Sequence, residues 1–194
     1  MDSEAFYQRM QEIAAREPAE RQRLMTQLHA VVLEEYCAAV GAITAEQAGR
    51  RLPDGRTMGQ VVGHIGAWDR YLILAAGEML AGVEWPSIMT LEGYVEADGK
   101  RRCFVSVDEF NAWQAELHAD WPWPSLQSMT LQMAETVYAL FTQPGLLTAE
   151  TLERTRPYVW WLPAHARLTM PAGWYLWGIA LEHEGVEHAA ELGI

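Results

Sequence analysis

Histidine and glutamate side chains gather near the C-terminus of the sequence, at a spacing suited to metal chemistry. Glu184 and His188 are about one helical turn apart, so they project from one face of a helix. With an advance of about 100° per residue, that face also carries Trp174, Trp177 and Leu181, the expected buried stripe. Because an unpaired charge in a protein core is costly, the buried carboxylate needs a partner charge or a metal ion.

A third candidate ligand lies on an earlier predicted helix. His64 shares the side of Val61 and Trp68, at the edge of an apolar stripe. Two imidazoles and one carboxylate are the ligands of catalytic zinc sites and of the facial triad of non-haem iron. Two interpretations follow. Either His64, Glu184 and His188 bind one metal ion, or His64 is a structural histidine and the other two form a hydrogen-bonded ion pair.

The run HEGVEH, residues 183–188, looks like the HExxH metalloprotease motif but is one residue too long. Five residues leave the two histidines about 140° apart on a regular helix. We therefore expect His183 and Glu187 on the opposite face and reject the metalloprotease interpretation. The sequence has no GxSxG, GxxxxGK or GxGxxG motif, which argues against the usual hydrolases, NTPases and dinucleotide enzymes. The remaining histidines have no partner pattern and are expected on the surface or in loops: His29, His118 and His165.

Long helical segments, separated by loops rich in proline and glycine, must position these residues. Helices are expected over residues 4–16, 18–41, 57–82 and 106–142, and from residue 171 almost to the C-terminus. The prolines of residues 121–124 break the fourth of these, which restarts at Ser125. Residues 94–105 form either a small hairpin around Asp98-Gly99 or a plain loop, and residues 146–169 are expected to be irregular.

These expectations give an all-α protein with a single domain over residues 1–194. The predicted architecture is an antiparallel four-helix bundle, with an irregular loop or small hairpin inserted between the second and third of its main helices.

Composition limits the partners of the protein. Its 194 residues include 26 acidic and 14 basic ones, a net charge of −12, and such a surface repels the phosphates of nucleic acids. No uncharged run reaches the ~18 apolar residues of a membrane span, and residues 1–16 lack a secretory signal. Cys37 and Cys103 are too few for a disulfide framework. We expect a cytoplasmic protein that binds neither nucleic acid nor membrane.

Nine tryptophans are a large number for this length. Those in or beside proline-rich connections either cap the core or form the wall of a substrate pocket above the metal: Trp121, Trp123, Trp160 and Trp161. Asp69 and Tyr71 follow His64 on the same predicted helix and are candidate catalytic proton carriers.

Two segments resemble a known family. Residues 57–69, TMGQVVGHIGAWD, resemble the second-helix motif of the DinB/YfiT-like metalloenzyme superfamily, and residues 184–192, EGVEHAAEL, are similar to its final-helix motif. The resemblance implies an up-down-down-up four-helix bundle, often a homodimer, with a divalent metal such as zinc or nickel held by His64, Glu184 and His188. Most members have a histidine where this chain has Glu184. Glutamate there resembles the branch of the mycothiol-dependent maleylpyruvate isomerase N-terminal domain.

The prediction is therefore a metal-dependent enzyme, a thiol-dependent transferase or isomerase that acts on a small electrophilic substrate. The metal would lower the pKa of a bound thiol or water, and the resemblance implies a low-molecular-weight thiol as a further cofactor. One alternative is a non-catalytic small-molecule binding or stress protein with the same cavity. The other is a structural or oligomerisation module in which Glu184 and His188 simply pair.

Overall fold

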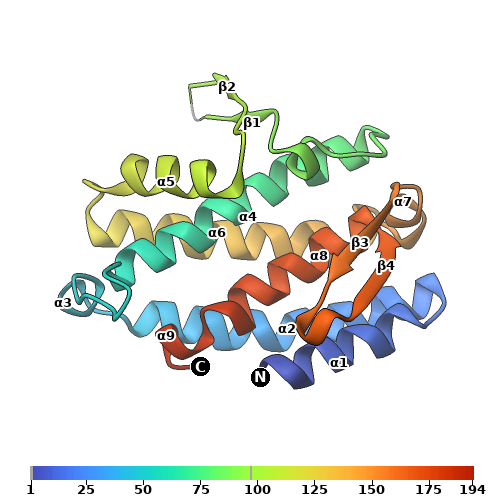
Figure 1. The fold of residues 1–194 in the computed structure, drawn as a ribbon, viewed down its shortest axis with the longest axis horizontal. Coiled ribbons are helices and arrows are strands. Elements are labelled where there is room, and N and C mark those ends of the chain that lie inside the picture. Colours follow the sequence, from blue (N-terminus) through green and yellow to red (C-terminus); the bar gives the residue numbers. More distant parts are fainter. Residues whose placement is uncertain (1, 97) are drawn as a thin grey trace.

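The computed structural model describes residues 2–96 and 98–194, and the chain is predominantly helical, as predicted (Figure 1). The helices are α1 (Ser3–Ala14), α2 (Pro18–Ala42), α3 (Ala45–Ala48), α4 (Met58–Leu80), α5 (Val107–His118), α6 (Trp123–Thr142), α7 (Ala149–Glu153), α8 (Ala172–Glu182) and α9 (Ala189–Leu192). Short 3₁₀ turns span Ser87–Thr90 and Pro163–His165. The strands are β1 (Tyr94–Val95), β2 (Arg101–Arg102), β3 (Pro157–Trp161) and β4 (Arg167–Pro171).

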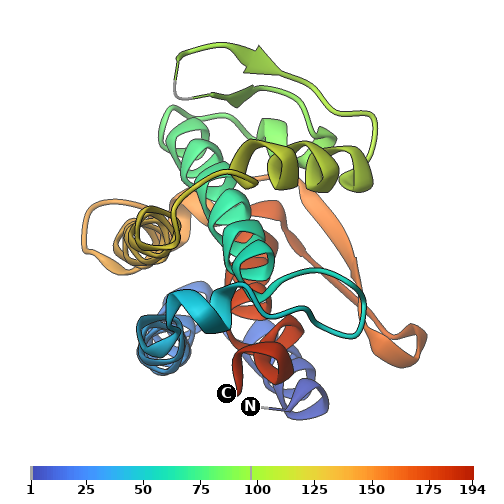
Figure 2. The same ribbon diagram turned by 90° about the vertical axis from the view of Figure 1, so that its left-hand side faces the viewer.

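The long helices pack around one another rather than on a sheet. α4 packs mainly against α6, and α6 also packs against α2. In Figure 2, which looks along α2 and α6, α4 passes between α6 and the C-terminal helices. The aromatic side chains of the core include Tyr36, Phe110, Trp174 and Trp177, all almost completely buried. Within residues 2–96 and 98–194, no helix combines the length and apolarity needed to cross a bilayer.

Helix α4 begins where its sequence predicts. The Thr57 hydroxyl accepts from the backbone N–H of Gln60, and the Gln60 side chain accepts from the N–H of Thr57, which completes a capping box. The helix ends before Gly82, which has a φ of +87°. Because α4 is regular, His64 and Asp69 point about 140° apart. The helix therefore presents them to two different places in the molecule.

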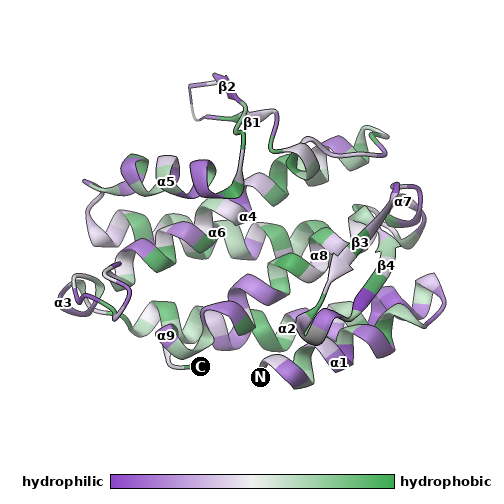
Figure 3. Ribbon diagram, viewed as in Figure 1, coloured by the Kyte–Doolittle hydropathy of each residue, from purple (hydrophilic) through white to green (hydrophobic). Residues whose placement is uncertain are grey.

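The C-terminal segment differs from its prediction. Residues His183–Glu187 form a π-helix between α8 and α9, so the last helix is not regular. A π-helix closes i→i+5 hydrogen bonds, so residues five apart lie near one face. The expectation that His183 and His188 point to opposite sides is therefore wrong. In Figure 3, the hydrophobic colour of α8 gives way to hydrophilic colour in this π segment.

A glycine lets the π segment lie close to α2. A Cβ atom on Gly185 would be 2.9 Å from Cγ1 of Val32, closer than real side chains approach. The segment packs against α2. The last helix therefore departs from regular α-helical geometry at the place where it packs closely against α2.

The two β-hairpins bear on the expectations for residues 94–105 and 146–169. β1 pairs with β2 around Gly99, which confirms the small hairpin, although the second strand is residues 101–102 and not 103–105. The expectation that residues 146–169 are irregular is wrong, because they contain α7 and β3, and β3 pairs antiparallel with β4. The outward residues Val159 and Trp161 are themselves apolar, so the polar–apolar alternation of a strand is absent.

The break between α5 and α6 lies where the prolines predict, but α6 begins at Trp123 and not at Ser125. Pro124 occupies the first turn, where no N–H donor is needed. The connection therefore costs α6 no hydrogen bond.

Candidate functional site

Three histidines, which we call the histidine cluster, lie together where α4 meets the π segment: His64, His183 and His188. The ring centroids are 5.2 Å apart for His64 and His188, 5.7 Å for His64 and His183, and 6.1 Å for His183 and His188. Imidazoles that bind one tetrahedral ion at about 2.0–2.1 Å have centroids roughly 5 Å apart. The cluster is therefore close to the arrangement of a three-histidine metal site.

The rings of the two C-terminal histidines are oriented by hydrogen bonds. Nδ1 of His188 lies 2.6 Å from Oε2 of Glu191, and Nδ1 of His183 lies 3.0 Å from the carbonyl oxygen of Ile179. Both oxygens can only accept, so in the neutral rings the hydrogen is on Nδ1 and the lone pair on Nε2. Metal-binding histidines usually have such a partner on the second nitrogen. In His188 this Nε2 is buried and has no hydrogen-bond partner.

His64 has a different partner. Its Nδ1 lies 3.4 Å from the side-chain nitrogen of Gln114 on α5. Burial, then the charges of His183, His188 and Arg56, lower the pKa of His64 to about 3. The ring therefore stays neutral, which is the form that binds metal ions.

An ionic chain reaches the cluster from the loop before α4. Arg56 lies 2.7 Å from Oε1 of Glu191, whose other oxygen accepts from His188, and Arg56 also pairs with Asp54 at 2.5 Å. The arginine thus helps to fix the carboxylate that orients His188. On the outer side, the half-exposed carboxylate of Glu187 lies 3.4 Å from Nε2 of His183.

Glu184 lies elsewhere. Its Oε2 is 3.5 Å from Nε2 of His29, and the indole N–H of Trp177 donates to Nδ1 of the same His29 at 3.0 Å. The hydrogen of neutral His29 is therefore on Nε2, facing Glu184. In the described part of the chain, this carboxylate has no hydrogen bond and no ion-pair contact with His64 or His188. Its predicted role as a ligand stays a prediction.

Four buried polar residues form what we call the acid cluster: His29, Tyr36, Asp69 and Glu184. Among the residues that the structure describes, none donates a hydrogen bond to the four carboxylate oxygens or pairs with the Tyr36 hydroxyl or Nε2 of His29. Burial raises the pKa of Glu184 to about 8, and burial with the charge of Glu184 raises the pKa of Asp69 well above its ordinary value. Burial and the two acids also raise the pKa of Tyr36. The cluster therefore favours protonated acids.

The structure separates the two candidate proton carriers from the histidine cluster. Asp69 belongs to the acid cluster. The hydroxyl of Tyr71 donates to the carbonyl oxygen of Glu92 at 2.5 Å, two turns or about 10 Å along α4 from His64. Trp68, by contrast, lies beside the cluster, with its ring centroid 5.7 Å from that of His183.

Several site residues were missed from the sequence. His183 was assigned to the wrong face because the helix was taken as regular, and His29 is completely buried although a surface position was expected. Gln114 carries a usable signal, since it is a polar residue one turn after the buried Phe110. As the side chains lie, no three His, Cys, Asp or Glu side chains within residues 2–96 and 98–194 meet the geometry of a metal site. The donor chemistry fits a divalent ion, since three neutral imidazoles lie together and two of them are held at Nδ1 by acceptor oxygens.

Comparisons with known proteins bear on the fold. No protein-family model matches the chain, and no curated protein matches it. The chain is similar to a solved structure, the crystal structure of the mycothiol-dependent maleylpyruvate isomerase, with a TM-score of 0.58 and 12% sequence identity. The match covers 89% of this chain and 60% of that one, so this chain spans less than two thirds of the length of its structural neighbour. At this identity the likeness concerns the helical fold alone.

Proposed function

We propose that this protein is a metal-dependent enzyme of the DinB/YfiT-like type, with thiol-related isomerase or transferase chemistry on a small electrophile. The observation that carries the proposal is the histidine cluster, in which three rings from two elements converge. The fold likeness to a mycothiol-dependent isomerase supports the thiol-related part of it. The same proposal includes an up-down-down-up helix order, a homodimer and a cytoplasmic location.

The ligands would be His64 and His188 with one further residue of the π segment. The sequence resemblance implies Glu184 as the third ligand, whereas the ring positions favour His183. We favour His183, because its Nδ1 is already held by a carbonyl oxygen while the Glu184 carboxylate faces His29. A divalent ion bound here would lower the pKa of a coordinated thiol or water, and so supply a nucleophile near neutral pH.

The chain's own residues have separate tasks in this proposal. Glu191 and the Ile179 carbonyl orient the rings of His188 and His183, so that little reorganisation is needed when a ligand binds. The half-exposed Glu187 carboxylate lies at the outer side of the cluster and is placed to accept a proton from an incoming thiol. Trp68 covers one side of the rings and limits the access of water.

Metal analysis tests the proposal directly. Protein purified without a metal-binding tag is expected to carry about one zinc, nickel or similar ion per chain, and His64→Ala is expected to carry almost none. The matched control is His165→Ala, which removes an exposed histidine that is not part of the histidine cluster. Wild-type protein that takes up no divalent ion, or His64→Ala protein with unchanged metal content, would contradict the proposal.

A further inference from the structure

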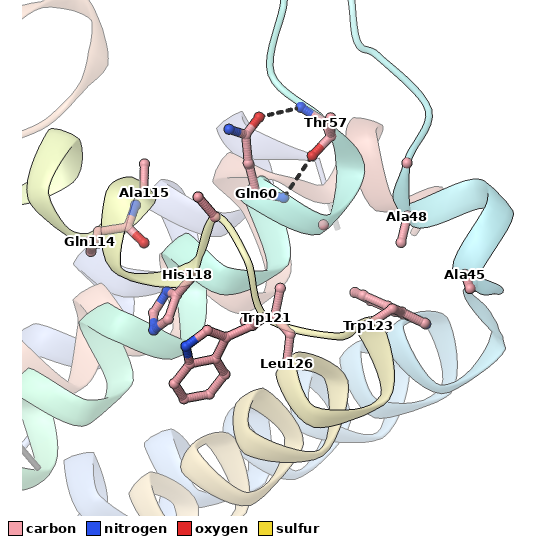
Figure 4. Close-up of a pocket in the computed structure, with 13 residues that line it drawn as sticks. Ala45, Ala48, Thr57, Gln60, Gln114, Ala115, His118, Trp121, Trp123 and Leu126 are labelled. Carbon is pink, nitrogen blue, oxygen red and sulfur yellow. Dashed lines mark hydrogen bonds between the residues drawn. The ribbon is translucent and has the colours of Figure 1, made fainter.

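A cavity of about 340 Å³ (Figure 4) is lined in part by Gln114, the residue whose side chain contacts His64 of the histidine cluster. It is bounded by α3, the start of α4, the end of α5 and the start of α6. Its volume is roughly twice the ~150 Å³ of an engineered cavity that binds benzene. The cavity is therefore large enough for a small two-ring molecule.

The wall of this cavity carries no charged side chain, since no Asp, Glu, Lys or Arg contributes to it. Trp121, Trp123 and Leu126 are its largest apolar side chains, and they lie along one side in Figure 4. The indole N–H of Trp123 donates to the carbonyl oxygen of Ile43 at 2.9 Å, so this N–H is not free for a ligand. An anionic ligand would find no cation here, in a protein whose net charge is −12.

Few polar atoms of the wall are available. The side chains of Thr57 and Gln60 satisfy the backbone groups of their own capping box, as the dashed lines in Figure 4 show. Gln114 is only 4% exposed, and its Oε1 has no hydrogen-bond partner. Nδ1 of His118 also lacks a partner, and the His118 ring packs on Trp121 with centroids 4.9 Å apart. Nε2 of the exposed Gln60 takes no part in the capping box, so the Gln114 amide is the buried polar contact of the wall and Gln60 an exposed one.

Gln114 also connects the cavity to the histidine cluster, because the nitrogen of the same amide lies 3.4 Å from Nδ1 of His64. If His64 binds a metal through Nε2, its Nδ1 carries the hydrogen and the amide turns its oxygen toward it. The amide then presents N–H to the cavity in place of oxygen. A hydroxyl group both donates and accepts, so it satisfies either orientation of the amide.

We propose that this cavity binds an uncharged molecule with an aromatic or aliphatic body and a hydroxyl group, which hydrogen-bonds the Gln114 amide. The inference rests on the proposed function in one respect: the ligand is the substrate only if the histidine cluster holds the metal. The aromatic body would pack against Trp121 and Leu126, and the hydroxyl end would lie toward His64. The specificity is therefore for alcohols or phenols over carboxylates.

Three probes that differ in one group test this inference. Naphthalenemethanol, naphthoate and methylnaphthalene share a ring system but carry a hydroxyl, a carboxylate and no polar group. Titrations followed by the indole N–H signals in NMR, with the Trp121 signal assigned from Trp121→Phe, give the dissociation constants. The alcohol is expected to bind at least tenfold more tightly than the carboxylate, and more tightly than the hydrocarbon.

Variants locate the binding. Ala115 lines the cavity, so Ala115→Trp should fill it and weaken alcohol binding more than tenfold. The control Ala112→Trp places the same side chain on an exposed position of the same helix and should leave binding unchanged. Gln114→Leu should remove the preference for the alcohol over the hydrocarbon.

Two results would overturn the inference: naphthoate binding as tightly as the alcohol, or Ala115→Trp protein that binds like wild type. Titrations of protein stripped of metal separate this inference from the proposed function. A chain that takes up no ion but binds the alcohol in this cavity would refute the metal enzyme and keep the pocket. A chain that takes up one ion but binds no alcohol would refute the pocket and keep the metal enzyme.

Discussion

The histidine cluster and the acid cluster share two elements, α4 and the π segment, yet they are chemically opposite, and α2 adds His29 and Tyr36 to the acid cluster alone. α4 contributes His64 to the first and Asp69 to the second, and the π segment contributes to both. In the histidine cluster each Nδ1 lies within hydrogen-bond distance of a neighbouring group, while in the acid cluster the carboxylate oxygens have none. In His183 and His188 an acceptor oxygen holds the hydrogen on Nδ1 and leaves the Nε2 lone pair for a cation, whereas unpartnered buried acids retain protons.

One spacing explains how the clusters separate. His64 and Asp69 are five residues apart on a regular α-helix, which turns them about 140° from each other. His183 and His188 are also five residues apart, but the π-helix brings their rings within 6.1 Å. An interval of five residues therefore points two side chains in different directions on α4 but brings two side chains together at the π-helix.

Removing the third metal ligand should give the largest loss of zinc affinity. His183→Ala is expected to weaken zinc binding at least 100-fold, more than the 10–100-fold typical of a lost outer partner, because it removes a coordinating ring. Glu184→Gln keeps the shape of the side chain and is expected to change the affinity less than threefold. Competition with a fluorescent chelator measures both constants. The opposite ranking of the two variants would assign the third ligand to Glu184, as the sequence resemblance implies.

The next effect concerns the orientation of His188. Glu191→Ala is expected to reduce zinc affinity about 10–100-fold, because Nδ1 of His188 loses the carboxylate that holds its hydrogen. Glu191→Gln retains an acceptor oxygen and should recover part of the loss. The control is Glu116→Ala, an exposed glutamate on α5, which should have no effect. Equal affinities of Glu191→Ala and wild-type protein would show that His188 needs no such partner.

The sequence predicts α4 well because its local signals agree with its tertiary setting. The Thr57–Gln60 capping box and the apolar stripe give its start and its buried side, and both are confirmed. The π segment was not predicted, because a helical wheel assumes a constant advance per residue, and nothing in the run HEGVEH marks the extra residue in a turn. His29 was misplaced for a similar reason. Its burial depends on Trp177, which is distant in sequence and supplies the hydrogen bond.

Adding a methyl group to the π segment should lower the stability of the folded protein. Gly185→Ala places a methyl group 2.9 Å from Cγ1 of Val32, so it is expected to reduce the free energy of unfolding by at least about 1 kcal/mol. Gly77→Ala is the matched control, because a Cβ there meets nothing within 4 Å and alanine favours helix by about 0.5–1 kcal/mol. Urea denaturation of both variants gives the two values. A Gly185→Ala protein that is as stable as Gly77→Ala would show that the π segment can move away from α2.

The acid cluster makes a prediction about pH, with a slope of up to about 1.4 kcal/mol per pH unit for one proton. The pKa of Glu184 rises to about 8 in the folded protein, so between its ordinary value and pH 8 the folded state holds a proton that the unfolded state has released. The contribution of Glu184 to the free energy of unfolding should therefore fall as pH rises through this window. His29 and His64, each with a pKa lowered to about 3, act in the opposite sense below about pH 6.5, where their contribution rises with pH.

Glu184→Gln isolates the contribution of this one acid. In metal-free protein, the stability of the variant relative to wild type should increase steadily from pH 5 to pH 8, because the amide has no proton to lose. Urea unfolding at several pH values measures the difference, and Glu187→Gln, which changes a half-exposed neighbour, is the control. Parallel curves for Glu184→Gln and wild-type protein would mean that the buried carboxylate is already ionised at pH 5. It would then need a cation beside it, and the contrast between a cluster that awaits a metal and one that holds protons would fail.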